Sequence, residues 1–163
     1  MMWRNKAVSD TYEPGSVFKV FTAAAGLEEG VVTVDTTYNC VGAIQVADNR
    51  INCHKHEGHG VQTLEQGLMN SCNVTFISLG LGIGKDSFYT SFDKFGYLDK
   101  TGIDLPDEGR SIMHTYDNLG VVELATSAFG QNFKITAIQH IAAVNAVVNG
   151  GTGRRAKLSY VSN

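Results

Sequence analysis

Residues Ser16–Leu27 read SVFKVFTAAAGL, with apolar side chains at nearly every position. The Pro14-Gly15 pair before this stretch is typical of a turn, and Gly30 after it is typical of a residue that ends a helix. We therefore expect a helix from Ser16 to about Glu29. Because its apolar residues would occupy every face, this helix should be buried at the centre of the fold.

Ser16 and Lys19 lie three positions apart, so a helix places their side chains on the same face. A serine hydroxyl is a weak nucleophile until a nearby base removes its proton, and burial makes a lysine a better base by lowering its pKa. The start of a helix also provides free N–H groups that suit a developing oxyanion. Taken alone, the four residues favour a simpler interpretation, an N-capping serine and a lysine reaching solvent, because short motifs often match by chance.

The composition indicates a globular protein of one domain. The chain has 163 residues, of which 43% are hydrophobic and 18% charged, and its formal net charge is −3. The only basic cluster is Arg154, Arg155 and Lys157, so we expect no nucleic acid partner. No apolar run reaches the roughly 18 residues that span a bilayer. The chain is expected to be soluble as given, with any membrane anchor outside it.

The remaining pattern predicts a mostly helical chain with a few short strands. Two capping boxes, at Thr63–Gln66 and Thr136–Gln139, are typical of helix starts. The predicted strands are Val31–Val34 and Ala43–Ala47. The predicted helices are a short one from Thr63, one continuing to about Leu81 after an interruption at Asn70–Asn73, one from Asp86 to Phe95, and one from Thr136 to Val148. Residues 97–120 are expected to be rich in loops.

Three segments give the chain a family resemblance over about residues 3–152. Trp3–Lys19 reads WRNKAVSDTYEPGSVFK and resembles the active-site segment of class B penicillin-binding proteins, most closely those of a sporulation-specific branch. Ser71-Cys72-Asn73 resembles their second motif, Ser-x-Asn. Ser127–Gln131, with the helix that ends at Asn149–Gly151, resembles a later part of the domain. The resemblance implies the α+β fold of β-lactamases and D,D-peptidases, with this chain mostly its α-helical part.

That resemblance implies D,D-transpeptidation of peptidoglycan by an acyl-serine mechanism, which β-lactams block. Matched residue by residue, Ser16 is the nucleophile and Lys19 is its base. Ser71 relays a proton to the leaving group, and Asn73 holds the substrate amide and Lys19. The expected partners are peptidoglycan stem peptides, β-lactam antibiotics and possible glycosyltransferases. The parent protein is expected on the extracytoplasmic face of the bacterial cell membrane, with its anchor outside this chain.

The family's third motif, Lys-Thr-Gly on a sheet-edge strand, has no clear counterpart. Lys100–Gly102 reads KTG but precedes Ser127–Gln131 instead of following it, and it resembles an ordinary structural loop. After Thr152 the sequence departs from the family's usual continuation. We therefore expect residues 1–163 to form a single, incomplete transpeptidase domain that lacks the third-motif strand. Since one oxyanion donor is worth about a hundredfold in rate, the chain alone should be weak or inactive.

Cysteines and histidines between the first two motifs suggest a zinc site. Cys40, Cys53, His59 and Cys72 follow the spacing C-x12-C-x5-H-x12-C, and such a Cys3His set can close a tetrahedral structural site. The odd number of cysteines excludes complete internal pairing. A Cys40–Cys53 disulfide or free thiols remain as alternatives.

The family resemblance also implies a metal site at these residues. Elongation-type penicillin-binding proteins hold zinc in this insert through carboxylates, a His in a Gly-His-Gly context and a Cys inside the second motif. Gly58–Gly60 and Cys72 match the last two, while Cys40 and Cys53 stand where the carboxylates would be. His54 or His56 could replace His59 as the fourth ligand.

Two other functions remain possible. The chain could be a catalytically inactive, zinc-stabilised structural module derived from this family. A serine β-lactamase also uses Ser-x-x-Lys, but the sequence has no Glu-x-x-Leu-Asn segment of the kind that class A enzymes use to activate water.

Overall fold

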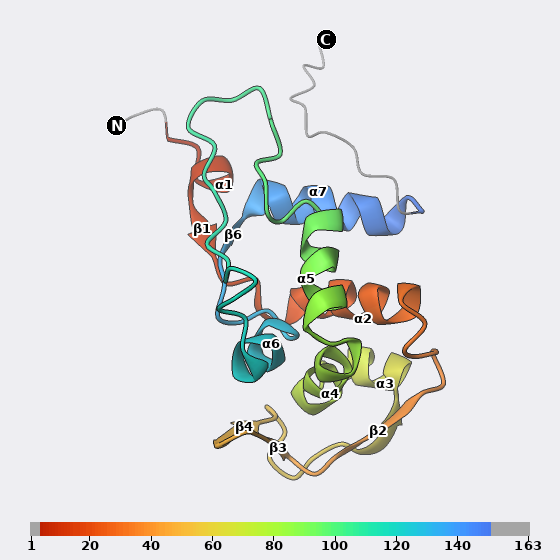
Figure 1. Cartoon of the computed structure of the whole chain (residues 1–163). Coiled ribbons are helices and arrows are strands. Elements are labelled where there is room, and N and C mark those ends of the chain that lie inside the picture. The colour runs from red at the N-terminus through yellow and green to blue at the C-terminus, as the bar shows by residue number, and fades with distance from the viewer. Residues whose placement is uncertain (1–3, 151–163) are drawn as a thin grey trace. The chain divides into compact units, whose positions relative to one another are not determined.

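The computed structural model describes residues 4–150 and divides the chain into two compact units. The first unit takes its residues from Met1–Glu13, Phe92–Met113 and Phe133–Asn163, and the second consists of Pro14–Ser91 and His114–Asn132. Figure 1 shows the helices and strands of both units. The expected mixture of helices with a few short strands is confirmed. Within residues 4–150, no helix is long and apolar enough to cross a bilayer.

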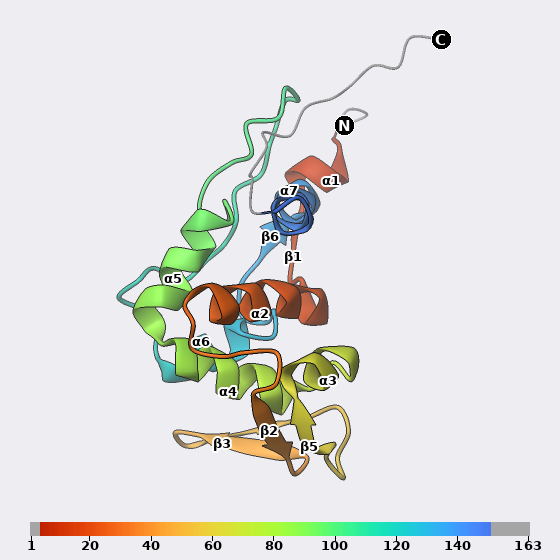
Figure 2. The ribbon, with the colours of Figure 1, turned by 90° about the vertical axis from the view of Figure 1, so that its right-hand side faces the viewer.

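In the second unit, the helix predicted from Ser16 packs against other helices. A 3-10 turn, η1 (Gly15–Phe18), leads directly into α2 (Lys19–Glu28), which packs on α4 (Asn73–Ile83). Helix α6 (Val121–Ser127) packs on α4 as well. In Figures 1 and 2, α4 lies between α2 and the strand β2 (Thr37–Cys40).

Helix α2 lies within the predicted range, but the α-helix begins at Lys19 and not at Ser16, because Gly15–Phe18 form the η1 turn, and the predicted burial on every face is wrong. Phe21, Ala23 and Ala25 are buried among its residues. Val20 and Leu27 of α2, however, are 38% and 43% exposed, and Val17 in the preceding η1 turn is 57% exposed. The helix therefore buries one broad face in the second unit and leaves a stripe of apolar side chains exposed. Apolar residues on every face of this helix wrongly predicted that every face is buried.

Four short strands form two antiparallel pairs in the second unit. β2 pairs with β5 (Gly60–Thr63), and β3 (Ala43–Val46) pairs with β4 (Asn49–Asn52). The prediction of a strand at Ala43–Ala47 is confirmed to within one residue. The strand predicted at Val31–Val34 is wrong. The backbone N–H of Thr33 bonds the Thr36 hydroxyl, and the Thr36 N–H bonds the Thr33 carbonyl, so these residues form a turn instead.

Local capping signals located the helices well. The Thr63–Gln66 capping box is present and starts α3 (Leu64–Met69), and the Thr136–Gln139 capping box starts α7 (Ala137–Val148). Helix α5 (Lys85–Lys94) is also confirmed, although Asp86 lies in its first turn and not at its cap. Helix α6 was not predicted.

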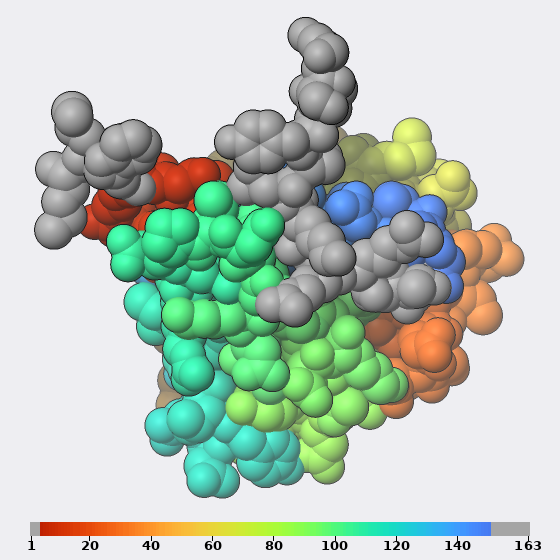
Figure 3. All heavy atoms as spheres, turned by 90° about the horizontal axis from the view of Figure 1, so that it is seen from above, coloured from red at the N-terminus to blue at the C-terminus, as the bar shows by residue number. Residues whose placement is uncertain are grey.

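The first unit is built around α7. Strand β1 (Thr11–Tyr12) pairs antiparallel with β6 (Ile135–Thr136), which leads into α7. The side-chain amide of Gln139 donates to the Asp99 carbonyl at 2.7 Å and so ties α7 to the loop that follows α5. Figure 3 shows part of α7 as blue spheres.

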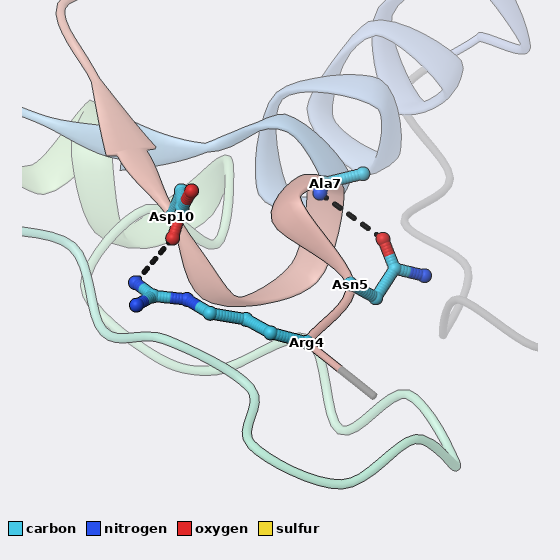
Figure 4. Close-up of polar contacts among 4 residues, drawn as sticks. All are labelled: Arg4, Asn5, Ala7 and Asp10. Carbon is cyan, nitrogen blue, oxygen red and sulfur yellow. Dashed lines mark hydrogen bonds and ion pairs between the residues drawn. The ribbon is translucent and has the colours of Figure 1, made fainter. Parts of the chain in front are cut away.

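At the start of the first unit, polar side chains fix a short helix, α1 (Lys6–Ser9). Figure 4 shows that the Asn5 side chain accepts from the Ala7 N–H, as an N-cap residue does, and that Arg4 pairs with Asp10.

Lys100–Gly102 lies in a loop of the first unit, as expected, and not on a strand. The Thr101 N–H and hydroxyl both donate to the Glu108 carboxylate at 2.6 Å, and the Gly102 N–H donates to its other oxygen at 3.1 Å. The carboxylate therefore holds this KTG sequence in a closed loop.

Helix α4 owes its close contact with α6 to a missing side chain. An ideal Cβ added at Gly80 would lie 2.5 Å from the Cβ of Ala128, whereas a Cβ at Gly82 would meet nothing within 4 Å. We predict that Gly80→Ala lowers the free energy of unfolding by roughly 1–2 kcal/mol, because overpacking outweighs the better helix propensity of alanine. Gly82→Ala, the matched control, should raise it by up to about 1 kcal/mol. Denaturant unfolding would measure both, and equal effects would contradict the close contact.

Candidate functional site

The structure places the side chains of Ser16 and Lys19 together. Ser16 lies in the η1 turn and Lys19 is the first residue of α2, so the tightly wound chain brings both side chains to one face. Lys19 Nζ lies 3.1 Å from Ser16 Oγ. The simpler interpretation, a lysine that reaches solvent, is wrong, because Lys19 is 0% exposed.

The Lys19 amine also bonds the second motif, 52 and 54 residues further along the chain. Its Nζ donates to the Ser71 carbonyl at 2.6 Å, to Ser71 Oγ at 2.9 Å and to Asn73 Oδ1 at 2.8 Å. An ammonium has three N–H groups, and four oxygens surround this one. The contact to Ser16 Oγ is the longest of the four. When the amine is neutral, its nitrogen can accept a hydrogen bond from the Ser16 hydroxyl.

Burial shifts the acid–base behaviour of Lys19. Loss of solvation lowers the pKa of its ammonium from 10.5 to about 8, although nearby Cys53 and Cys72 act in the opposite direction. At pH 7, roughly a tenth of the molecules then carry a neutral amine. The arrangement can therefore accept a proton from Ser16 near neutral pH, as a general base must.

The second motif is held in shape by its own backbone. Ser71 has a left-handed conformation (φ 50°), and the Cys72 N–H donates to the Gly67 carbonyl at 2.9 Å, so the chain turns back sharply between α3 and α4. Asn73 then begins α4, and its amide nitrogen donates to the Asn52 carbonyl at 3.3 Å. Both ends of the Asn73 amide are thus occupied, which fixes its orientation.

The catalytic candidates line a pocket of about 270 Å³ in the second unit. The pocket is lined by Ser16, Ser71 and Asn73. It is also lined by four residues that were not among the predicted catalytic residues: Gly15, His54, Phe129 and Gln131. The Gly15 N–H donates to the Gly130 carbonyl at 2.8 Å, which brings the segment after α6 against the start of η1. The family resemblance of Ser127–Gln131 drew attention to this segment. The structure shows that two of its residues line the pocket.

The four predicted metal ligands lie together. The ligand atoms of Cys40, Cys53, His59 and Cys72 all lie within 4.8 Å of one another. Cys40 ends β2, Cys53 and His59 lie in the loop between β4 and β5, and Cys72 caps α4. All three cysteines are free and buried, so the alternative Cys40–Cys53 disulfide is not present.

The distances within this cluster suit a tetrahedral metal ion. Cys53 Sγ lies 3.9 Å from Cys72 Sγ and 3.7 Å from His59 Nδ1. A tetrahedral zinc ion with ordinary bond lengths separates two sulfurs by about 3.8 Å, and a sulfur from a nitrogen by about 3.6 Å. The cluster could therefore hold a metal with little rearrangement. His54 Nδ1 is also near Cys53 Sγ, at 3.8 Å, but the compact set of four contains His59, and it contains neither His54 nor His56.

The local environment favours metal-binding forms of two of these side chains. Burial raises the pKa of the Cys53 thiol, but hydrogen bonds with the Lys55 and Asn73 backbone and with the Cys72 and Cys40 side chains together outweigh burial, so the net pKa is lowered. Burial and nearby positive charges lower the pKa of His59, which favours the neutral imidazole that binds metals. Burial raises the pKa of Cys72.

Comparison with known proteins establishes the family. The sequence matches the penicillin binding protein transpeptidase domain over residues 2–161, and this chain belongs to that family. It is similar to stage V sporulation protein D of Bacillus subtilis, with 47% identity over 151 residues, which are 91% of this chain and 23% of that protein. The resemblance to the sporulation-specific branch is thereby confirmed.

Comparisons with more distant relatives support the same family and fold. Peptidoglycan D,D-transpeptidase MrdA of Escherichia coli is 33% identical over 113 residues, 68% of this chain and 18% of that protein. The chain therefore spans less than a quarter of the length of these two relatives. The fold matches the apo structure of the TP domain of Burkholderia pseudomallei penicillin-binding protein 3, with a TM-score of 0.90 and 20% identity, over 98% of this chain and 48% of that one. The expected D,D-peptidase-like fold is confirmed.

The burial of Lys19 predicts an unusual titration. We expect its side chain to titrate near pH 8, because burial disfavours the charged form. NMR of the lysine side-chain nitrogen and ε-carbon would measure this, and the Lys19→Arg variant would assign the signal by removing it. A Lys19 signal that titrates at the ordinary value of 10.5 would contradict the buried environment.

Proposed function

We propose that Ser16, Lys19, Ser71 and Asn73 form the acylation site of a peptidoglycan D,D-transpeptidase. Ser16 Oγ attacks the carbonyl carbon of the penultimate D-Ala of a stem peptide, and Lys19 Nζ takes the hydroxyl proton. The peptide bond to the terminal D-Ala breaks, and an amine of a second stem peptide later displaces the serine from the acyl-enzyme. The observation that carries this proposal is the single buried amine within 3.1 Å of both serine hydroxyls.

Ser71 offers a path for the proton that Lys19 accepts. Its hydroxyl is 2.9 Å from Lys19 Nζ, so the amine can pass a proton to Ser71 while Ser71 gives its own to the departing D-Ala nitrogen. The leaving group then departs as a neutral amine. This relay needs no movement of Lys19, which its bonds to the Ser71 carbonyl and to Asn73 hold in place.

Asn73 orients both the base and the substrate in this proposal. Its Oδ1 accepts from Lys19 Nζ, and its side chain lines the pocket beside Ser16. The family resemblance assigns this asparagine to the substrate amide. Holding the acyl donor in a fixed position against Ser16 turns an encounter between two molecules into a reaction within one complex.

For the whole protein, we propose work on peptidoglycan at the extracytoplasmic face of the bacterial membrane, in cell wall or spore cortex synthesis. Support comes from the similarity to a sporulation protein and to a peptidoglycan D,D-transpeptidase. β-Lactams are proposed as inhibitors that acylate Ser16, and a glycosyltransferase is a proposed partner because transpeptidation crosslinks newly made glycan strands.

We further propose that Cys40, Cys53, His59 and Cys72 hold a structural zinc ion. Thiolates and a neutral imidazole are ligands that zinc prefers, and four protein ligands close its coordination. A bound zinc ion would join β2, the β4–β5 loop and the start of α4. Since Cys72 lies between Ser71 and Asn73, the site would restrain both of these residues.

Covalent labelling tests the acylation site. Incubation of this chain with fluorescent penicillin should give an adduct that intact-mass analysis localises to Ser16, and Ser16→Ala should abolish it. Ser87→Ala, a serine of the second unit outside the pocket, is the matched control and should label like the unaltered chain.

An absent adduct, or one that survives Ser16→Ala, would contradict the proposed acylation site. Stoichiometric zinc without any adduct would favour the structural, non-catalytic module. Rapid turnover of nitrocefin would favour the β-lactamase alternative.

Elemental analysis tests the zinc site. Protein purified without chelator should contain about one zinc ion per chain, and Cys72→Ser should lose most of it, because a hydroxyl is a far poorer zinc ligand than a thiolate. His56→Ala is the matched control in the same loop and should keep the zinc. A chelator should lower the Tm of the unaltered chain, since metal that binds only the folded state stabilises it. Unaltered chain without stoichiometric zinc would contradict the proposal.

A further inference from the structure

His54 occupies a position that neither the acylation chemistry nor the metal cluster explains. It lines the same pocket as Ser16, Ser71 and Asn73, although it belongs to the loop that carries Cys53 and His59. It is not part of the compact set of four metal candidates. Of the three histidines in this loop, His54 is the one that reaches the pocket within the described residues.

Two contacts fix where the His54 ring sits. Its Nδ1 lies 3.8 Å from Cys53 Sγ, and its ring centroid lies 5.2 Å from that of His59, at an interplanar angle of 57°. The ring is therefore held against the metal cluster on one side. Because Nδ1 faces the sulfur, Nε2 is the ring nitrogen that a ligand in the pocket can reach.

A third contact places His54 on the Asn73 side of the pocket. The Asn73 amide nitrogen donates to the carbonyl of Asn52, only two residues before His54. The loop that carries His54 is thus fastened to the side chain assigned to the substrate amide. The His54 ring and the Asn73 side chain therefore line one pocket and are joined through the Asn52 carbonyl.

We propose that His54 contacts the substrate and selects acyl donors that carry a secondary amide next to the reacting carbonyl. Its Nε2 forms a hydrogen bond with that amide. A secondary amide has both an N–H donor and a C=O acceptor, so a neutral imidazole can bond it in either tautomer. In a stem peptide this amide joins the penultimate D-Ala to the preceding residue, and in benzylpenicillin it is the acylamino side chain. This inference rests on the proposed acylation at Ser16 and deepens it.

Rates of acylation by two penicillins test the selection. Benzylpenicillin carries the side-chain amide, and 6-aminopenicillanic acid has the same reactive ring with a free amine in its place. We expect His54→Phe, which keeps a ring but loses both nitrogens, to slow Ser16 acylation by benzylpenicillin about tenfold, the value of one hydrogen bond. The rate with 6-aminopenicillanic acid should change less than twofold. His54→Gln restores a donor and an acceptor and should recover most of the loss, while His56→Phe, the matched control, should affect neither penicillin.

Several results would overturn the inference. If His54→Phe slowed both penicillins equally, the ring would act only by supporting the loop, and if it slowed neither, the ring would not meet the ligand. Loss of zinc from His54→Phe would make His54 a metal ligand instead. Each of these results leaves Ser16 labelling intact, so they differ from failure of the proposed function, in which no penicillin forms a Ser16 adduct.

Binding without reaction gives a second measurement. In the Ser16→Ala variant, titration with N-acetyl-D-Ala-D-Ala should shift the NMR signals of the His54 ring, and titration with D-Ala-D-Ala, which lacks the acyl amide, should shift them much less. The His54→Gln variant assigns the ring signals by removing them. An unshifted ring with both peptides would overturn the inference even if no penicillin reacts with the chain.

Discussion

One buried amine holds the second unit's site together. Lys19 sits at the first turn of a helix, and its Nζ bonds three oxygens of a segment more than 50 residues away, Ser71 O, Ser71 Oγ and Asn73 Oδ1. Burying an ammonium is costly unless its donors are satisfied. The fold offsets that cost by surrounding the amine with oxygens, and these oxygens belong to the groups that the proposed acylation at Ser16 would use. The bonds that stabilise the buried amine are therefore the same bonds that would position it as a base.

The cysteine cluster adjoins the bonds around Lys19 through Cys72. Cys72 is 0% exposed and separates two residues whose side chains both bond Lys19. The peptide backbone on either side of Cys72 connects the cluster directly to Ser71 and Asn73, so the geometry of the cluster restrains both residues. The loop between β4 and β5 makes a second connection, because Asn52 bonds Asn73 while Cys53 joins the cluster. Ser71 and Asn73 are thus connected to the cluster in two ways, through Cys72 and through the Asn52–Asn73 hydrogen bond.

Much of this could be predicted from the sequence because the signals are local. The capping boxes at Thr63 and Thr136 marked helix starts correctly, since the bonds that define them lie within four residues. The strand predicted at Val31–Val34 is wrong because Thr33 and Thr36 form a turn, in which the Thr33 N–H donates to the Thr36 hydroxyl and the Thr36 N–H donates to the Thr33 carbonyl. Spacing suggested the pairing of Ser16 with Lys19, and the family resemblance suggested Ser71 and Asn73. The pocket position of His54 could not be predicted, because it depends on how a loop folds back over α4, a long-range property that no local pattern encodes.

The bond from Lys19 to the Ser71 carbonyl, the shortest of its contacts at 2.6 Å, comes from the main chain. Every amino acid carries this oxygen, so a substitution at position 71 can delete the hydroxyl, and with it the proposed proton relay, while the lysine keeps that acceptor. One contact of the buried amine is therefore indifferent to the identity of residue 71, whereas the contacts to Ser16 Oγ, Ser71 Oγ and Asn73 Oδ1 each depend on one particular side chain.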